Sequence, residues 1–156
     1  MTSDDPSRSW FPSEPEPEPR RTSKQDIAEV LVRYASGIDR RDWDLFRSCF
    51  TSDCQADYGD IGSWESADAI TDFMISAHTD MGHTMHRISN IAVDVDVDAG
   101  GERAVARSYV DGILMAPDAQ SGFNPVGFYD DDLVRTGGGW RIARRTFTMV
   151  HFRTFH

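Results

Sequence analysis

The sequence has very little lysine and cysteine and no long apolar run. Lys24 is the single lysine, and no stretch approaches the roughly 18 apolar residues of a membrane-spanning helix. The N-terminus also lacks the basic and apolar regions of a secretory signal peptide, so we expect a cytoplasmic protein that does not associate with membranes. The two cysteines, Cys49 and Cys54, have no second pair with which to form a zinc site, and we expect two reduced thiols.

The common nucleotide, metal and nucleophile motifs are also missing. We find no G-x-x-x-x-G-K-[ST], G-x-G-x-x-G, H-E-x-x-H or G-x-S-x-G. The alternating aspartates of 94–102 resemble a calcium loop, but its sixth position is Ala99 instead of glycine and its twelfth is Val105 instead of glutamate. The three aspartates of 130–132 cannot chelate one ion from a strand, because neighbours point to opposite faces. We expect solvated acids there, and neither a metal nor an organic cofactor.

What is present suits one acidic domain. The chain has 156 residues, 39% of them hydrophobic, and a formal charge of −10. Such a surface repels phosphate backbones, so nucleic acid is not an expected partner. Residues 1–21 hold five of the seven prolines, and we expect a disordered tail there, followed by one domain over 22–156.

Three helices are predicted in the first half of the domain. Thr22 and Gln25 form a capping box, and helical spacing of apolar residues follows it to Ile38. Further helices are expected over about 42–50 and about 66–80, with a short strand or loop around Tyr58 between them. The apolar faces of the three helices are Ile27, Val30, Leu31, Tyr34 and Ile38; Trp43, Phe46 and Phe50; and Ile70, Phe73, Met74 and Ala77.

The second half reads as sheet. Long strands are predicted over 83–98, 103–116, 125–136 and 140–153, and glycine-containing turns mark the two hairpins. Three helices followed by four long antiparallel strands indicate the α+β class, a curved sheet with helices on one face. A sheet bent over helices encloses a cavity, where a small apolar ligand can bind.

The segment "YASGIDRRDWDLFRSCFTSDCQADYG" (34–59) resembles the opening of the SnoaL-like proteins of the nuclear transport factor two-like superfamily. "TMHRISNIAVDVD", "RAVARSYV" and "GFYDDDLVRTGGGWRIARRTF" continue the resemblance, which covers roughly 22–153. Scytalone dehydratase, bile acid dehydratase, a hexachlorocyclohexane dehydrochlorinase and ketosteroid isomerase belong to that superfamily. The resemblance implies a cone-shaped, cystatin-like α+β barrel. It also implies a homodimer, since the family commonly packs sheet on sheet.

The resemblance also implies a catalytic dyad. In the dehydratase branch an aspartate follows the first helix just before a "DWD"-like segment, and here that residue is Asp39. A histidine opens the first long strand in a T-x-H context, and here that residue is His86. Tyr34 matches a tyrosine that lies five residues before the aspartate in the bile acid enzyme. Tyr58 matches a second tyrosine, that of scytalone dehydratase, and Tyr129 falls at the position of that enzyme's pocket asparagine.

One departure from the pattern concerns the substrate. The second pocket histidine of scytalone dehydratase has no counterpart in the strand that contains Tyr109, which argues against the same substrate. Either Tyr109 or Tyr129 could supply the missing polar group. Asn90 is a pocket donor or a bulge residue, and Trp43 and Phe73 are pocket wall or core.

The dyad predicts a cofactor-free lyase or isomerase, in first place a dehydratase, acting on a small apolar cyclic molecule such as a polyketide, steroid or aromatic intermediate. A carboxylate on one imidazole nitrogen fixes the tautomer and makes the other nitrogen a better base. Tyr34 or Tyr58 would bind the oxyanion or protonate the leaving hydroxyl. The alternatives are a non-catalytic protein that binds a small molecule, and an assembly subunit that pairs through its outer sheet face.

Three local features of the sequence remain open. Tyr34 and Asp39 lie about 140° apart on an ideal helix, so they share a pocket only if the helix ends or bends near Gly37. For His86 to face inward, the strand must either twist out of the core or bulge near Ser89 and Asn90, because the apolar residues beyond have odd numbers. Residues 144 and 145 are both arginines, and one of them should point inward because neighbours on a strand alternate. For either arginine taken alone, the expected role is a surface ion pair.

Overall fold

The structure, a computed structural model, describes residues 22–98 and 100–156. The predicted tail over 1–21 lies outside these residues. Within the described ranges, no helix combines the length and apolarity needed to span a bilayer. In chain order the elements are α1 (Ser23–Arg40), α2 (Trp43–Ser48), β1 (Phe50–Asp57), η1 (Gly59–Ile61), β2 (Ser63–Trp64), α3 (Ala67–His78), β3 (Thr84–Asp98), β4 (Gly101–Met115), β5 (Gly122–Thr136) and β6 (Gly139–Phe155).

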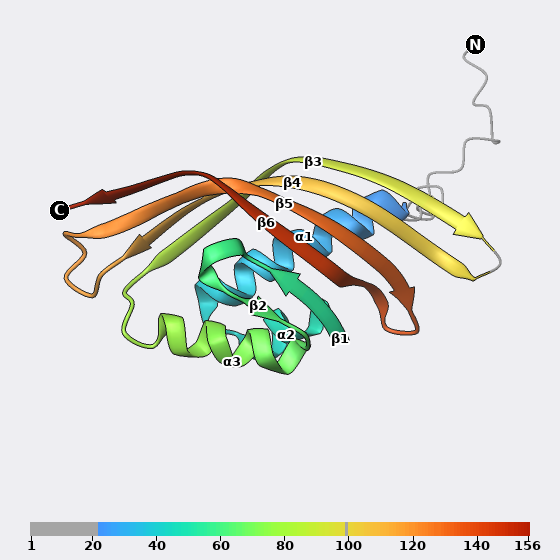
Figure 1. The fold of residues 1–156 in the computed structure, drawn as a ribbon, viewed down its shortest axis with the longest axis horizontal. Coiled ribbons are helices and arrows are strands. Elements are labelled where there is room, and N and C mark those ends of the chain that lie inside the picture. Colours follow the sequence, from blue (N-terminus) through green and yellow to red (C-terminus); the bar gives the residue numbers. More distant parts are fainter. Residues whose placement is uncertain (1–21, 99) are drawn as a thin grey trace, which may run out of the picture.

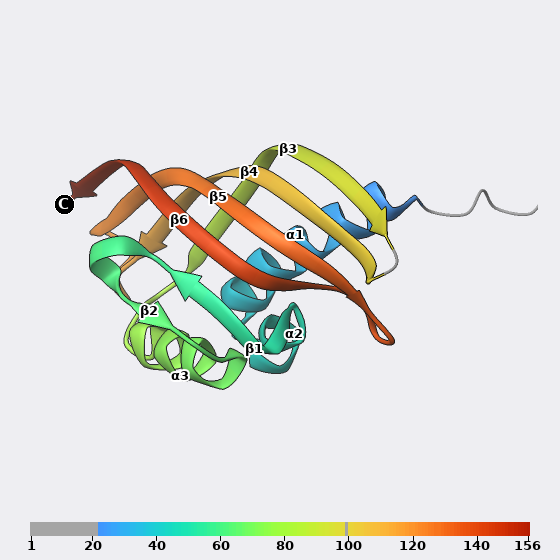
Figure 2. The ribbon, with the colours of Figure 1, turned by 45° about the vertical axis from the view of Figure 1, so that its right-hand side comes forward.

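The strands form one six-stranded sheet in the order β2-β1-β6-β5-β4-β3. The four long strands are antiparallel neighbours and bend together over the helices, which all lie on the concave side (Figure 1). The turned view shows α1 running beneath the long strands, with α3 beside β1 and β2 (Figure 2). This confirms the α+β prediction. The sheet is mixed, however, because β1 pairs with β6 in parallel.

Helix α1 begins and ends as its sequence predicts. Thr22 and Gln25 cap each other's backbone N–H groups, and Arg41 ends the helix in the left-handed conformation with φ 57°. The predicted apolar face is buried against the sheet and α2. Gly37 does not end the helix. It lets α2 approach closely, since a Cβ built there would lie 2.8 Å from the backbone nitrogen of Phe46.

Strand β3 changes which residues face inward at Asn90. Before it the half-buried residues have even numbers, as at His86, and after it odd numbers, as at Val93. The pairing register with β4 shifts between Ser89 and Ala92, and Asn90 has φ 50°. A bulge with an extra residue produces such a change of parity. Of the two possibilities left open by the sequence, a twist or a bulge, the structure has the bulge, and it is what lets His86 face the helices.

A second bulge lies in β6. The register with β5 shifts between Asp132 and Leu133, which leaves Ala143 as an extra residue. Because of it, Ile142 and Arg145 both face inward although they are three residues apart. The question left open by the pair of arginines is thereby answered: the second one is buried.

Candidate functional site

A cavity of about 300 Å³ lies between the concave face of the sheet and helices α1 and α3. This volume is at the lower end for small-molecule sites. Most of the wall is apolar, and Phe73, Leu114 and Phe147 are typical members of it. The polar side chains of the wall are two histidines and three tyrosines: His78, His86, Tyr34, Tyr58 and Tyr129.

His86 and Asp39 are in direct contact at one end of this cavity. The His86 Nδ1 atom lies 2.7 Å from Asp39 Oδ1, and the backbone N–H of His86 donates to Asp39 Oδ2 at 2.8 Å. Because a carboxylate only accepts, Nδ1 carries the hydrogen in the neutral imidazole and Nε2 carries the lone pair. His86 lines the cavity, whereas Asp39 does not. The carboxylate therefore holds the imidazole from behind.

A second set of hydrogen bonds positions Asp39. Thr84 donates to Asp39 Oδ1 at 2.9 Å and accepts from Arg41 Nη1 at 2.8 Å. The Arg41 guanidinium also donates to the carbonyls of Ile38 and Gly82. Arg41 thus ties the end of α1 to the start of β3. These contacts fix the direction of the carboxylate, which is what a dyad requires of its supporting groups.

The surroundings keep Asp39 ionised. Partial burial by itself would raise the pKa of its carboxyl group, but hydrogen bonds from the side chain and backbone of His86 and from Thr84 outweigh that effect. The net result is a pKa below the usual value. Asp39 is therefore an anion at neutral pH, able to stabilise positive charge on His86.

Three tyrosines meet along the wall of the cavity. The hydroxyl of Tyr34 lies 2.7 Å from that of Tyr58 and 3.4 Å from that of Tyr129. Burial raises the pKa of all three phenols. They are therefore protonated at neutral pH and can donate hydrogen bonds or a proton to a ligand.

The guanidinium of Arg145 lies behind the tyrosines, on the side away from the cavity. It stacks on the rings of Tyr34 and Tyr129, 4.1 and 3.9 Å from their centroids, and forms a bidentate ion pair with Asp131 at 2.7 and 2.8 Å. Both charged side chains are fully buried. The positive charge opposes the burial effect on the pKa of each phenol, Tyr58 included. The expectation of solvated acids at 130–132 is wrong for Asp131.

The structure also corrects the expected relation of Tyr34 to Asp39. The helix does not end near Gly37 but continues to Arg40. Tyr34 faces the cavity directly, while Asp39, on another side of the helix, reaches it only through His86. The two residues therefore need not point the same way to serve one cavity.

Two predicted pocket residues lie elsewhere. Asn90 is the exposed residue of the β3 bulge and does not line the cavity, because its left-handed backbone turns the strand there. Trp43 is half-buried and packs against the rings of Phe46 and His78 outside the cavity. Phe73, by contrast, belongs to the wall. Tyr109 is exposed on the opposite face of the sheet and supplies no polar group to the cavity.

His78 is a cavity residue that the sequence analysis missed. It is the last residue of α3, and a polar residue at a helix end carries no pattern that sets it apart from a surface position. Burial lowers the pKa of its imidazole, partly offset by a hydrogen bond to the carbonyl of Met74. The cavity therefore holds two imidazoles from two different elements.

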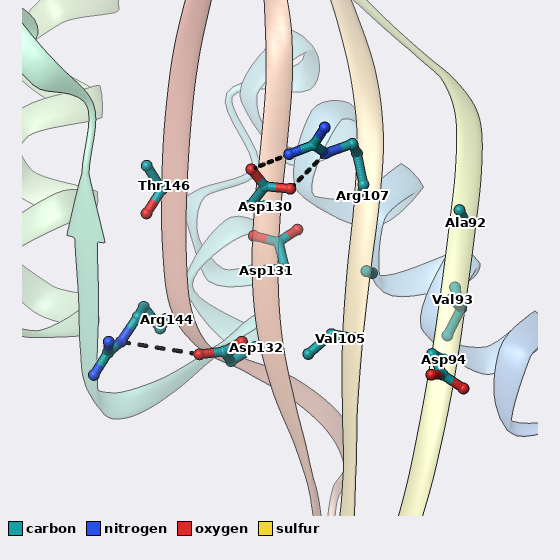
Figure 3. Close-up of a pocket in the computed structure, with 11 residues that line it drawn as sticks. Ala92, Val93, Asp94, Val105, Arg107, Asp130, Asp131, Asp132, Arg144 and Thr146 are labelled. Atoms are coloured by element: carbon teal, nitrogen blue, oxygen red, sulfur yellow. Dashed lines mark hydrogen bonds and ion pairs between the residues drawn. The ribbon is translucent and has the colours of Figure 1, made fainter.

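Larger hollows lie on the outer face of the sheet, but they are shallow and charged. The one in Figure 3 is lined by residues of β3 to β6, with Arg107 paired to Asp130 and Arg144 next to Asp132. These side chains are largely exposed, and each arginine lies next to an aspartate of opposite charge. An open, solvated groove of this kind lacks the apolar enclosure of the inner cavity.

The described part of the chain offers the cavity neither a reactive thiol nor a group of three metal-ligating side chains. Cys49 and Cys54 are free and buried, and burial raises the pKa of each thiol to about 11. They are thus poor nucleophiles at neutral pH. Among residues 22–98 and 100–156, no three histidine, cysteine, aspartate or glutamate side chains converge as a metal site requires.

Comparison with known proteins gives one family. The model of the SnoaL-like domain matches residues 19–146. A protein of Mycobacterium tuberculosis (strain ATCC 25618 / H37Rv), described only as uncharacterized, is 31% identical over 128 residues, which are 81% of this chain and 85% of that protein.

Solved structures share the fold. A candidate scytalone dehydratase from Novosphingobium aromaticivorans DSM 12444 superposes with a TM-score of 0.73 at 23% identity, covering 84% of this chain and 86% of that one. A Nostoc punctiforme PCC 73102 protein of unknown function with a cystatin-like fold gives a TM-score of 0.67 at 18% identity, covering 81% and 90%. The expected cystatin-like fold is therefore confirmed.

Proposed function

The chain belongs to the SnoaL-like domain family, and from that premise we propose that it is a cofactor-free lyase or isomerase, in first place a dehydratase, acting on a small, largely apolar cyclic molecule. The observation that carries the proposal is the 2.7 Å contact between His86 Nδ1 and Asp39 Oδ1, with the rest of the imidazole on the wall of an apolar cavity. The name of the structurally similar dehydratase candidate agrees with this choice.

His86 acts as the general base. Its Nε2 lone pair removes a proton from a carbon next to a carbonyl group, and the electron pair of that C–H bond moves onto the carbonyl oxygen. The imidazolium that forms is stabilised by the anion of Asp39. Proton removal is favoured in the cavity because apolar walls leave few competing waters around the nitrogen.

The tyrosines act on the oxygen atoms of the substrate. A phenol O–H of Tyr34 or Tyr58 donates a hydrogen bond to the developing enolate oxygen. When the enolate collapses, the C–O bond to a β-hydroxyl breaks, and the hydroxyl takes a proton from the other phenol and leaves as water. The proton held by His86 then replaces the one that the phenol has given up, which restores both groups. If no such hydroxyl is present, the proton returns to another carbon and the reaction is a double-bond shift. The buried charge of Arg145 helps the phenols to donate.

The test uses a simple β-hydroxy ketone, 3-hydroxy-1-tetralone, whose loss of water gives 1-naphthol and is followed by fluorescence. We expect turnover by the wild-type protein. Asp39→Asn and His86→Ala should lower kcat by about 10²- to 10⁴-fold, the usual contribution of general base catalysis. His83→Ala is the matched control, because His83 is exposed three residues away and should leave turnover unchanged.

Binding of the ketone is measured in the same variants by calorimetry. Asp39→Asn should retain binding while it loses turnover. Wild-type protein that binds the ketone without converting it would instead assign the chain to the non-catalytic binding proteins. A His86→Ala variant as active as a wild type that turns the ketone over would show that His86 is not the base.

A further inference from the structure

His78 presents an unused hydrogen-bond acceptor in the interior. Its Nδ1 atom lies 2.8 Å from the backbone oxygen of Met74. A carbonyl oxygen can only accept, so Nδ1 carries the hydrogen and Nε2 carries the lone pair. Nε2 is buried and has no hydrogen-bond partner among the described residues. The side chain is only 6% exposed, so bulk solvent does not satisfy that atom.

The imidazole lies on the wall of the same cavity as His86. The two ring centroids are 6.5 Å apart, and the ring of Trp43 packs against His78 at 6.0 Å from outside the cavity. One hydrogen bond of roughly 2.9 Å from a ligand oxygen to His78 Nε2 fits within such a distance between rings. A ligand hydroxyl can therefore lie against His78 and donate its one hydrogen there, while His86 Nε2 remains free to act on a carbon atom.

A purely structural role does not account for the free nitrogen. Buried polar atoms in native proteins are almost always hydrogen-bonded, and an exception calls for a partner that is absent or for a function. An apolar side chain would fill the same place without that cost. The lowered pKa of His78, which burial causes, keeps the imidazole neutral and its lone pair available.

We propose that Nε2 of His78 accepts a hydrogen bond from a hydroxyl group of the ligand, so that the cavity selects apolar rings that carry a hydroxyl donor. The inference rests on the proposed function in using the same cavity, and it adds the polar group by which the ligand is recognised. Because Nε2 carries no proton, His78 can hold a hydroxyl but cannot protonate a leaving one. The hydroxyl that it holds is one that stays on the ring, while the tyrosines act on the oxygen that leaves.

The test compares two probes of the same shape, 2-naphthol and 2-methylnaphthalene, by titration calorimetry. Wild-type protein should prefer the naphthol by about tenfold, the effect of one hydrogen bond to a buried acceptor. The variant His78→Phe keeps a ring but has no acceptor. In this variant the ratio of the two affinities should fall to about the ratio in which the two probes partition from water into an apolar solvent. The preference for the naphthol should remain in His78→Gln, whose amide oxygen can accept.

A direct readout separates His78 from His86, which also offers an acceptor. In ¹⁵N-labelled wild-type protein, the resonance of His78 Nε2 should have the shift of an unprotonated imidazole nitrogen and should move when 2-naphthol is added but not with 2-methylnaphthalene. This measurement needs no variant and decides the matter if His78→Phe does not fold. An unmoved His78 resonance, or an undiminished naphthol preference in folded His78→Phe, overturns the inference alone. Failure of both probes to bind wild-type protein overturns it together with the apolar-ligand part of the proposed function.

Discussion

Asp39 holds His86 through both of its carboxylate oxygens, one on the ring and one on the backbone N–H. An amide could not replace it without loss, because its NH₂ group would face a donor that now finds an acceptor. The carboxylate is thus part of the fold as well as of the proposed chemistry. Its contribution to stability should depend on pH in a way that its lowered pKa defines.

We therefore predict a pH-dependent stability difference between wild-type protein and Asp39→Asn. A carboxyl group whose pKa is lower in the folded state stabilises the protein above its unfolded-state pKa, and the stabilisation is lost as the pH falls through the folded-state value. At pH 7 the variant should be less stable by about 1–3 kcal/mol, the cost of an unsatisfied buried donor. The difference should shrink below about pH 4.

Urea unfolding followed by circular dichroism between pH 7 and pH 3 measures this difference. Asp60→Asn is the control, since Asp60 is exposed and lies outside the site. A difference that stays constant over the whole pH range would mean that the ionised carboxylate is not what stabilises the fold.

For single residues, a role can be predicted from the sequence when the residue type and position match a family pattern. It cannot be predicted when the role depends only on how the residue packs in the fold. Asp39 and His86 were predicted because they match the aspartate and the histidine of the dehydratase pattern. His78 was missed because a histidine at a helix end resembles any surface residue there. The sequence does not decide whether Arg145 faces inward, because burial of its guanidinium depends on Asp131, fourteen positions away in sequence.

Helices α1 and α2 meet at a point where only glycine fits. A Cβ atom on Gly37 would lie 2.8 Å from the backbone nitrogen and 2.9 Å from the Cα atom of Phe46. These are backbone atoms, so the clash cannot be relieved by turning a side chain. The approach matters to the site because Phe46 packs against Tyr34, with ring centroids 5.2 Å apart.

Gly37→Ala should therefore destabilise the protein, although alanine is the better helix former. Overpacking costs about 1–3 kcal/mol and the gain in helix propensity is about 1 kcal/mol, so we expect a net loss of up to about 2 kcal/mol in urea unfolding. Gly137→Ala is the matched control, because a Cβ there meets nothing within 4 Å. Equal stability of both variants would show that α2 can move away from α1 at no cost.

The strands illustrate what an apolar pattern can and cannot locate. In β3 the change of parity between His86 and the following valines is visible in the sequence and requires either a twist or a bulge near Asn90. Pairing with β4 decides for the bulge. In β6 the pattern around Ile142 and Phe147 is equally consistent with either arginine facing inward. The bulge at Ala143 that decides between them is a property of pairing with β5.

At the scale of the whole molecule, the parallel pairing of β1 with β6 joins the first half of the chain to its last strand. Local pattern gives no sign of this pairing, since β1 is short and its partner lies about ninety residues later. The consequence is that Tyr58, just after β1, is brought next to Tyr34 and Tyr129. The tyrosine cluster is therefore a product of topology.

The ion pair of Asp131 and Arg145 joins β5 to β6 beneath that cluster, and its energetics can be tested against a matched pair on the other face. Removing one partner of a buried pair leaves an uncompensated charge, whereas removing both leaves none. Asp131→Leu and Arg145→Met should each cost about 3–5 kcal/mol in urea unfolding, and the double variant should cost much less than their sum.

Asp130 and Arg107 join β5 to β4 with the same bidentate geometry but in solvent, so their double-mutant cycle should show no comparable coupling. Additive losses at Asp131 and Arg145 would mean that the two charges are stabilised separately, and the guanidinium would then be held by the tyrosine rings instead of by its carboxylate.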